Sequence, residues 1–264
     1  MAKARSQRAG QLGSFDPYQE RPANQLLRLL PRGAMEALLS ALELVEAGPG
    51  ESLFEPGDDV THAHFPLDAT VIAFVLPMRD GRTVEAATIG REGCAGGVVS
   101  LGLKPAFARA TVQIPGRLGR IPIPKLEAAK RAMPKVHDVL ARYADCLIAQ
   151  VMQSVGCAAL HPLEARCARW LLMTHDRLAR SELPLTQEML AEMFGAARTY
   201  VTRIANRFQG RGAISYRRGI IRVLDRTALE ASACECYQLV RQHFERVLPG
   251  LYPTAEPWAS PDPW

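Results

Sequence analysis

The stretch from Leu185 to Leu224 decides the fold, and it reads LTQEMLAEMFGAARTYVTRIANRFQGRGAISYRRGIIRVL. Two short segments with apolar residues at three- and four-residue steps meet at Gly195, and such steps predict amphipathic helices. Two β-like segments follow, joined by a tight turn that ends at Gly219. Two short helices joined by a turn, with a strand pair behind them, are the pattern of a winged helix-turn-helix.

The same stretch carries charge of one sign. Between Ala196 and Leu224 there are seven arginines and no acidic residue. A basic block on a helix and its adjoining hairpin favours a polyanionic partner, although a charge run alone is more often a solvated face. Because this block coincides with the helix-turn-helix pattern, we interpret it as a nucleic-acid surface. The arginines are Arg198, Arg203, Arg207, Arg211, Arg217, Arg218 and Arg222.

Local signals set the two helices of this unit. Thr186 is a good N-cap for the first helix, and Gly195 suits the left-handed turn that ends it. The second helix should run from about Arg198 to Phe208. Its buried face is predicted to consist of Val201, Ile204, Ala205 and Phe208.

The polar residues on the outer face of the second helix form the candidate base-reading set. Arginine pairs with guanine, asparagine with adenine, and threonine contacts a thymine methyl group or a phosphate. The turn at Arg217-Arg218-Gly219 should place two further arginines close to phosphates or the minor groove. Ordinary solvation is the alternative for all of these side chains. The predicted DNA-binding residues are Arg198, Thr199, Tyr200, Thr202, Arg203, Asn206, Arg207, Arg217 and Arg218.

Upstream residues predict a second, β-rich unit. Residues 25–47 carry apolar side chains at helical spacing, and Pro31 should divide them into two short helices. From about Leu44 the pattern changes to short apolar segments separated by turn residues. Asp80-Gly81 is a hairpin signal, and many short strands at this spacing imply a small antiparallel barrel or jelly roll. Such a barrel can hold a small ligand, or it can be filled by its own side chains.

A long helix is expected between the two units. Residues 134–160 carry apolar side chains at three- and four-residue steps over more than two heptads. A buried helix of a single domain would explain this stripe, but its place between two units favours pairing with a symmetry mate in a homodimer. Downstream we expect a helix over 163–178, a polar connector, the basic unit, and one amphipathic helix over 225–248.

Composition narrows the class of protein. The 264 residues are 48% apolar and carry a net charge of +5. No continuous apolar run reaches about 18 residues, and the N-terminus lacks an apolar signal core, so neither a membrane span nor export is predicted. A cytoplasmic protein with reduced thiols is the expectation. No nucleophile elbow, phosphate-binding loop or HExxH motif is present, so the sequence does not predict an enzyme.

The six cysteines begin at Cys94 and include no CxxC pair. Cys234 and Cys236 could bind a metal, but no third or fourth ligand lies at a useful spacing in the sequence. Scattered thiols are therefore expected, and no metal site is predicted. His62, His64, His137 and Met133 leave haem ligation open, although a lone histidine is more often structural.

The basic unit resembles the winged helix-turn-helix of the Crp/Fnr family of bacterial transcription regulators, through Leu185–Ile214 and IIRVLDRTALE. The segments GESLFEPGD and GRTVEAATIGREG and the long helix fit the same family, so the resemblance covers about residues 25–230. It implies a cyclic-nucleotide-binding-like β-roll, a homodimer on a near-palindromic operator, and RNA polymerase as a partner. Recognition-helix contacts fall on Arg198, Thr199 and Arg203. Thr199 stands where the cyclic-AMP-responsive member has a base-reading glutamate, so the operator should differ.

The effector site that the family implies is altered in this chain. Gly96-Gly97 stand where the family has Gly-Glu, so the acid for the ribose is missing. Ala108-Arg109 stand where it has Arg-Ser, and a shift of one residue in a strand turns a side chain to the other face. Arg91 and Glu92 are possible substitutes in a Gly-rich loop whose amides could approach an anion. The candidate effector residues are Arg91, Glu92, Gly96, Gly97 and Arg109.

These departures disfavour cyclic AMP, and no cofactor is assigned. The lack of any cysteine before Cys94 likewise disfavours the iron–sulfur sensor of the family's redox branch.

The expected fold is α+β: an N-terminal antiparallel β-roll, a long dimerisation helix and a C-terminal winged helix-turn-helix. We expect a homodimeric, sequence-specific DNA-binding transcription regulator, gated by an unidentified small effector in the β-roll. The alternative is a ligand-sensing signalling protein whose C-terminal module binds another protein. The expected division is a flexible lead-in (1–24), a β-roll sensor domain (25–123), a linker and dimerisation helix (124–160), a DNA-binding domain (161–248) and a Pro-rich tail (249–264).

Overall fold

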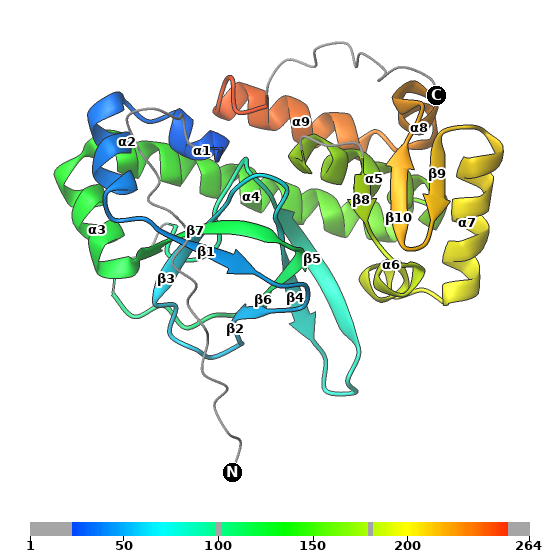
Figure 1. Ribbon diagram of the computed structural model, residues 1–264, viewed down its shortest axis with the longest axis horizontal. Helices are drawn as coiled ribbons and strands as arrows, with labels where there is room; N and C mark the ends of the chain where they lie inside the picture. Colours follow the sequence, from blue (N-terminus) through cyan, green and yellow to red (C-terminus); the bar gives the residue numbers. More distant parts are fainter. Residues whose placement is uncertain (1–22, 99–101, 179–181, 253–264) are drawn as a thin grey trace.

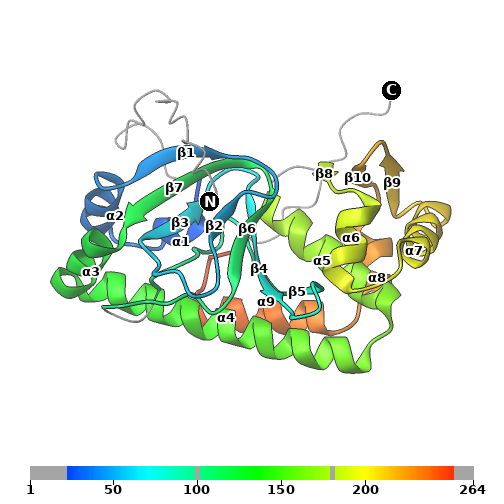
Figure 2. The same ribbon diagram turned by 90° about the horizontal axis from the view of Figure 1, so that it is seen from below.

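The computed structural model describes residues 23–98, 102–178 and 182–252. A β-roll lies at one end of the molecule and a unit of short helices with a small sheet lies at the other (Figure 1). The long helix α4 (Pro134–Leu160) runs beneath both (Figure 2). The expected lead-in lies almost wholly outside the described residues, as does the tail beyond Tyr252.

The β-roll consists of two antiparallel sheets with the strand orders β1-β7-β3 and β2-β6-β4-β5. Phe65, Ile72, Val112 and Leu118 are fully buried, as expected where alternate residues of each strand face the interior. The predicted hairpin at Asp80-Gly81 joins β4 to β5. The strands are β1 (Glu43–Ala47), β2 (Ser52–Phe54), β3 (His62–Pro66), β4 (Val71–Pro77), β5 (Thr83–Ile89), β6 (Arg109–Ile114) and β7 (Gly116–Pro122).

The expected helical stretch over 25–47 is wrong at its C-terminal end. The helices α1 (Gln25–Arg28) and α2 (Arg32–Leu39) are separated at Pro31 as predicted, but residues 43–47 form β1. That strand pairs with β7, and Val45 lies opposite Leu118. The short segment ELVEA fits a helical and a strand period equally well, so its distant partner decides its structure.

The apolar stripe of α4 contributes to two different surfaces. In its first half Val136, Leu140 and Tyr143 belong to the main core, next to α3 (Ile123–Ala132) and the β-roll. In its second half the apolar side chains turn outward: Ile148 is 58% exposed, Met152 68% and Val155 67%. The surface expected to pair with a symmetry mate is therefore confined to the second half of the helix.

Helix α4 is also the one helix of the described residues that is long and apolar enough to cross a membrane, with a mean hydropathy of 1.2 over its most apolar window. Length and composition are the only features that indicate this. Its first half packs into the core, as a core helix of a globular domain does.

The C-terminal unit contains the predicted elements and one more. Strand β8 (Glu182–Pro184) pairs with β10, so the expected polar connector is wrong over these residues. A segment so short shows no periodicity from which a strand could be predicted. The other elements are α5 (Leu163–Leu178), α6 (Gln187–Phe194), α7 (Arg198–Gly210), β9 (Ile214–Arg217) and β10 (Ile220–Val223).

The single terminal helix expected over 225–248 is wrong. The chain forms α8 (Arg226–Ser232) and α9 (Cys236–Val247), and Ala233 between them is extended. No glycine or proline explains this break. It brings Cys234 and Cys236 together with Cys157 and His161 at the end of α4. The sequence shows no third or fourth ligand at a useful spacing from the two cysteines, because spacing along the chain does not report contacts between distant segments.

Candidate nucleic-acid interface

The two helices of the helix-turn-helix are set by the residues predicted to set them. The Thr186 hydroxyl accepts a hydrogen bond from the Met189 amide at 3.1 Å and caps α6. Gly195 ends that helix in the left-handed conformation, with a φ of 59°. The predicted inner face of α7 is confirmed, because its members are all buried: Val201, Ile204, Ala205 and Phe208. This packing leaves the opposite face of α7 free.

The predicted DNA-binding residues of α7 lie on that free face, with one exception. Arg198, Thr199, Tyr200, Arg203, Asn206 and Arg207 are exposed. Thr202 is half-buried, and its hydroxyl donates to Gln187 Oε1 at 2.8 Å or to the Arg198 carbonyl at 2.9 Å. The first of these bonds joins α7 to α6, so Thr202 positions the helix rather than presenting a free hydroxyl.

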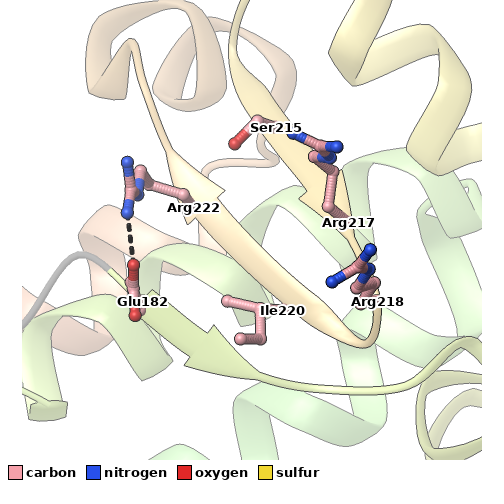
Figure 3. A pocket seen from close by; sticks show the side chains of 6 residues that line it. All are labelled: Glu182, Ser215, Arg217, Arg218, Ile220 and Arg222. Atoms are coloured by element: carbon pink, nitrogen blue, oxygen red, sulfur yellow. Dashed lines mark hydrogen bonds and ion pairs between the residues drawn. The ribbon is translucent and has the colours of Figure 1, made fainter. Parts of the chain in front are cut away.

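The basic block is partly neutralised by acids outside it. Arg207 and Arg211 form ion pairs with Glu164 of α5, at 2.7 and 3.1 Å. Arg222 pairs with Glu182 of β8, and only this pair is joined by a dashed line in Figure 3. Such pairs reduce the positive charge that these three side chains can offer to a phosphate. The sequence contains no local signal for them, because both acids precede the block.

Four arginines of the block form no ion pair with any described residue: Arg198, Arg203, Arg217 and Arg218. Arg203 lies over the ring of Tyr200, with 5.9 Å between the guanidinium carbon and the ring centre. This contact holds the guanidinium on the outer face of α7 without neutralising its charge. The free positive charge is thus divided between α7 and the wing.

The wing is a two-residue hairpin, as predicted. Arg217 and Ile220 pair across it, and both central residues have positive φ, 51° for Arg218 and 77° for Gly219. Such a turn matches the right-handed twist of the two strands. Arg218 adopts a conformation that is uncommon for a residue with a side chain. The turn therefore presents Arg217 and Arg218 at the tip of the wing, as predicted.

A hollow of about 570 Å³ separates the wing from α6 and α7. Arg198 lines it from α7, and Arg218 and Gly219 line it from the wing. A second hollow of about 400 Å³ lies on the other side of the wing, and its lining residues are those drawn in Figure 3. The surface is concave on both sides of the wing and positively charged at its tip, and a nucleic-acid backbone has the complementary charge.

Glu92, one of the candidate effector residues, has a different partner. Its carboxylate forms a buried ion pair with Arg177 of α5, at 2.7 Å between Oε1 and Nε. The Arg177 side chain is 0% exposed and that of Glu92 is 3% exposed. The Gly90 amide donates to both carboxylate oxygens, at 3.0 and 3.1 Å. Both carboxylate oxygens of Glu92 are therefore engaged in contacts within the protein.

The same ion pair is the centre of a network between three parts of the chain. Arg177 also donates to Gln150 Oε1 of α4 at 2.9 Å and to the Thr88 hydroxyl of β5. Gln150 in turn donates to the Thr88 carbonyl at 3.0 Å. The network joins the β-roll, the long helix and the first helix of the C-terminal unit. We name it the Arg177 network: Thr88, Gly90, Glu92, Gln150 and Arg177.

The glycines Gly90, Gly96 and Gly97, in the loop after β5, have packing roles. A Cβ atom at Gly90 would lie 2.6 Å from the Cβ of Arg177, so a side chain there would displace the arginine. At Gly96, which has a φ of 90°, a Cβ would lie 2.7 Å from the His62 carbonyl oxygen, and at Gly97 it would collide with Ile123. The Gly-rich sequence is thus explained by close approach of neighbouring elements.

The two candidate effector arginines differ from each other. Arg109 pairs with Glu55 at 2.8 Å between Nε and Oε2, and both side chains are half exposed. Arg91 is half-buried, and its Nε has no hydrogen-bond partner among the described residues. Burial lowers the pKa of the Arg91 guanidinium. The effector role of all five candidates stays a prediction.

A buried histidine gives the β-roll a predictable sensitivity to acid. His64 of β3 is 8% exposed, and its Nδ1 has no hydrogen-bond partner among the described residues. Burial lowers its pKa to about 4, and the neighbouring His62 and Arg120 act in the same direction. In the unfolded chain the pKa is about 6.5, so only the unfolded state takes up a proton as the pH falls from 6.5 to 4.

The lowered pKa of His64 therefore leaves the free energy of unfolding unchanged above pH 6.5 and reduces it as the pH falls towards 4. Between pH 7 and pH 4.5 we expect the free energy of unfolding to fall by about 2 kcal/mol through this residue. Urea unfolding of the wild type and His64→Gln at both pH values measures it. The variant should lose about 2 kcal/mol less than the wild type over this range. An equal loss in both proteins would contradict the prediction.

The comparisons with known proteins agree with this geometry. A family model of the Crp-like helix-turn-helix domain matches residues 165–232. A transcriptional regulator of the CRP family from Thermus thermophilus is similar in structure, with 20% identity, a TM-score of 0.58, and coverage of 72% of this chain and 96% of that one. FixK2 from Bradyrhizobium japonicum has 16% identity, a TM-score of 0.59, and coverage of 73% and 98%.

A third solved structure is the c-di-GMP responsive global regulator CLP from Xanthomonas campestris. Its identity is 14% and its TM-score 0.57, with coverage of 73% of this chain and 99% of that one. No curated protein matches the sequence. At these identities the solved structures show the fold, while the family match covers both helices of the helix-turn-helix and the wing. The chain therefore contains a Crp-like helix-turn-helix domain and has the fold of the Crp/Fnr transcription regulators.

Proposed function

We propose that this protein is a homodimeric transcription regulator in the cytoplasm that binds a near-palindromic DNA operator in a sequence-specific manner. The observation that carries the proposal is the outer face of α7 beside the wing, where Arg198 and Arg203 are exposed and form no ion pair with any acid that the structure describes. An α-helix of this kind fits the major groove, in which each base pair has a distinct pattern of donors and acceptors.

The ion pairs refine the roles of the residues. Arg198, Thr199, Arg203 and Asn206 are exposed side chains on one helix face and are the best placed to contact bases. Arg217 and Arg218 at the wing tip are better placed for the phosphate backbone. Arg207 needs to leave Glu164 before it contacts DNA, so we assign it a smaller contribution.

The outward stripe of α4 supports the homodimer. Ile148, Met152 and Val155 are spaced four and three residues apart, so they form one exposed apolar line along the helix. Two such lines bury each other when the helices of two subunits pair about a twofold axis. A twofold dimer places two recognition helices symmetrically, which is why the operator should be near-palindromic.

The remaining assignments follow from the same division of the chain. Residues 25–123 form the sensor domain for a small effector, 124–160 the dimerisation helix with its linker, and 161–248 the DNA-binding domain. RNA polymerase is the further protein partner. The Arg177 network supports gating by an effector, because it connects the β-roll directly to α5 of the DNA-binding domain.

Substitutions on α7 and on the wing should have different effects on DNA binding. The operator is first selected from a pool of random duplexes with the wild-type protein. Arg203→Ala should then lower the ratio of operator to scrambled-DNA affinity by about 5- to 150-fold, the equivalent of 1 to 3 kcal/mol for one base contact. Arg218→Ala should weaken binding to both DNAs alike and reduce the slope of log affinity against log salt by about one.

Arg222→Ala is the matched control, since its guanidinium already pairs with Glu182. It should change neither the specificity ratio nor the salt slope appreciably. If the wild type enriches no sequence at low salt, the proposal fails, and the C-terminal module would instead be a protein-binding unit.

A further inference from the structure

Four potential metal ligands from two distant segments meet at the C-terminal end of α4. Cys157 and Cys234 have their sulfur atoms 3.5 Å apart, and Cys236 Sγ lies 3.4 Å from His161 Nδ1. All four ligand atoms lie within 4.8 Å of one another. We name these residues the Cys3His cluster. It is separate from the α7 face and the wing.

The spacing suits a tetrahedral ion. With metal–sulfur bonds of about 2.3 Å and metal–nitrogen bonds of about 2.0 Å, such an ion holds its ligand atoms about 3.5 to 3.8 Å apart. The two measured separations are close to this range. A disulfide needs a sulfur–sulfur bond of about 2.05 Å, which is much shorter than the distance between Cys157 and Cys234.

The local structure of both segments is explained by the cluster. Cys157 and His161 are four residues apart, so the last turn of α4 places them on one face. Cys234 and Cys236 lie at the break between α8 and α9, where neither glycine nor proline accounts for the change in direction. The three cysteines are buried, whereas the His161 side chain is 21% exposed. The break thus turns two thiols towards the end of the long helix.

Two further contacts are of the kind that surrounds a metal site. Glu235 Oε1 lies 3.2 Å from His161 Nε2, so a hydrogen bond there leaves Nδ1 as the atom that faces Cys236. A carboxylate that orients a histidine in this way is common next to zinc ligands. Gln153 Nε2 also donates to Cys236 Sγ at 3.0 Å.

A buried cation lies on the inner side of the cluster. Arg169 of α5 is 8% exposed, and its Nε has no hydrogen-bond partner among the described residues. Its guanidinium is close enough to Cys157 for the two groups to interact electrostatically. Three thiolates and one neutral imidazole around a divalent ion carry a net charge of about −1. Such a site would add negative charge near this buried arginine.

We infer that Cys157, His161, Cys234 and Cys236 bind one Zn²⁺ ion, with His161 as a ligand through Nδ1. Thiolate and imidazole ligands select zinc over magnesium or calcium, which prefer oxygen. Four protein ligands leave no open position, so the site is structural rather than catalytic. The ion joins the end of α4 to the α8–α9 connection and so holds the DNA-binding unit on the helix proposed for dimerisation.

The first test is the metal content of the full-length protein. The protein is purified under reducing conditions without chelator, and zinc is measured by inductively coupled plasma mass spectrometry. We expect about one zinc per chain, and at least about tenfold less in Cys157→Ser and in Cys234→Ser. Cys146→Ala is the matched control, because Cys146 is a buried thiol of the same helix outside the cluster, and it should retain the zinc.

Several results would overturn the inference. These are wild-type protein without zinc, equal zinc in both serine variants and the wild type, or an intact mass showing a disulfide between Cys157 and Cys234. If the serine variants do not fold, wild-type protein produced in cobalt-supplemented, zinc-depleted medium is measured instead. It should show the visible absorption of tetrahedral cobalt with thiolate ligands, and the absence of that absorption would count against the site.

The role given to the ion, which is to hold the DNA-binding unit on the dimerisation helix, rests on the proposed function, whereas the metal measurements do not. If zinc is present but no DNA is bound, the function fails and the site stands. If DNA is bound but zinc is absent, the metal site fails and the proposed function stands.

Discussion

Replacing Arg177 by methionine should lower the free energy of unfolding by about 3 to 5 kcal/mol, because it leaves a buried carboxylate without its counter-ion. The Glu92 side chain is 3% exposed and cannot recover its hydration while the protein stays folded. Gln150 and Thr88 each lose a hydrogen-bond donor at the same time. Urea unfolding followed by circular dichroism measures the change.

The double variant Arg177→Met/Glu92→Gln separates the charge from the packing. Replacing Glu92 by an uncharged residue removes the buried charge, so most of the lost stability should return. A single variant that loses less than about 1 kcal/mol would show that the pair is not buried in solution. A double variant as unstable as the single one would show that packing around Arg177 matters more than its charge.

The network should also transmit changes between the β-roll and α5, so the double variant should alter the response of DNA binding to any effector.

Replacing Met152 by glutamate should dissociate the proposed homodimer. The side chain is 68% exposed in one chain and lies in the middle of the apolar line on α4. A dimer would bury two unpaired carboxylates at this contact, at a cost of several kcal/mol. We expect the dimer dissociation constant to rise by at least about 100-fold, and binding to a palindromic operator to fall with it. Sedimentation-velocity ultracentrifugation measures the dissociation constant.

Leu160→Glu provides the matched control. Leu160 is 80% exposed on the same helix. It follows Met152 by eight residues, and this step turns its side chain away from the apolar line. This variant should remain a dimer. A Met152→Glu protein that dissociates no more than Leu160→Glu would contradict the assignment of the interface.

The winged helix-turn-helix could be predicted nearly in full from the sequence, for a physical reason. Its signals act within a few residues: Thr186 caps its own helix, Gly195 ends it, and Arg218-Gly219 make the turn of the wing. The buried face of α7 also follows directly from the helical period. The antiparallel β-roll could be predicted as a class but not strand by strand, as the helical reading of 43–47 shows.

The sequence predicts which residues belong to the candidate site. It does not predict which of its arginines keep their charge free of an ion pair. Glu164 and Glu182 neutralise three of the seven arginines, and nothing in the basic block itself indicates either partner. The spacing of Cys157 and His161 is a local signal of the cluster, because it places two metal ligands on the same face of a helix. It becomes informative only when Cys234 and Cys236 are seen beside it.

By itself, the sequence determined the helix-turn-helix, the wing and the α+β class, because short-range periodicity, caps and turns specify local structure. The tertiary structure alone decided which arginines face solvent unpaired, that Glu92 meets Arg177, and that four metal ligands meet at the end of α4. Each of these depends on contacts between segments far apart in the chain. Such contacts are set by how whole elements pack, and no window of the sequence contains both partners.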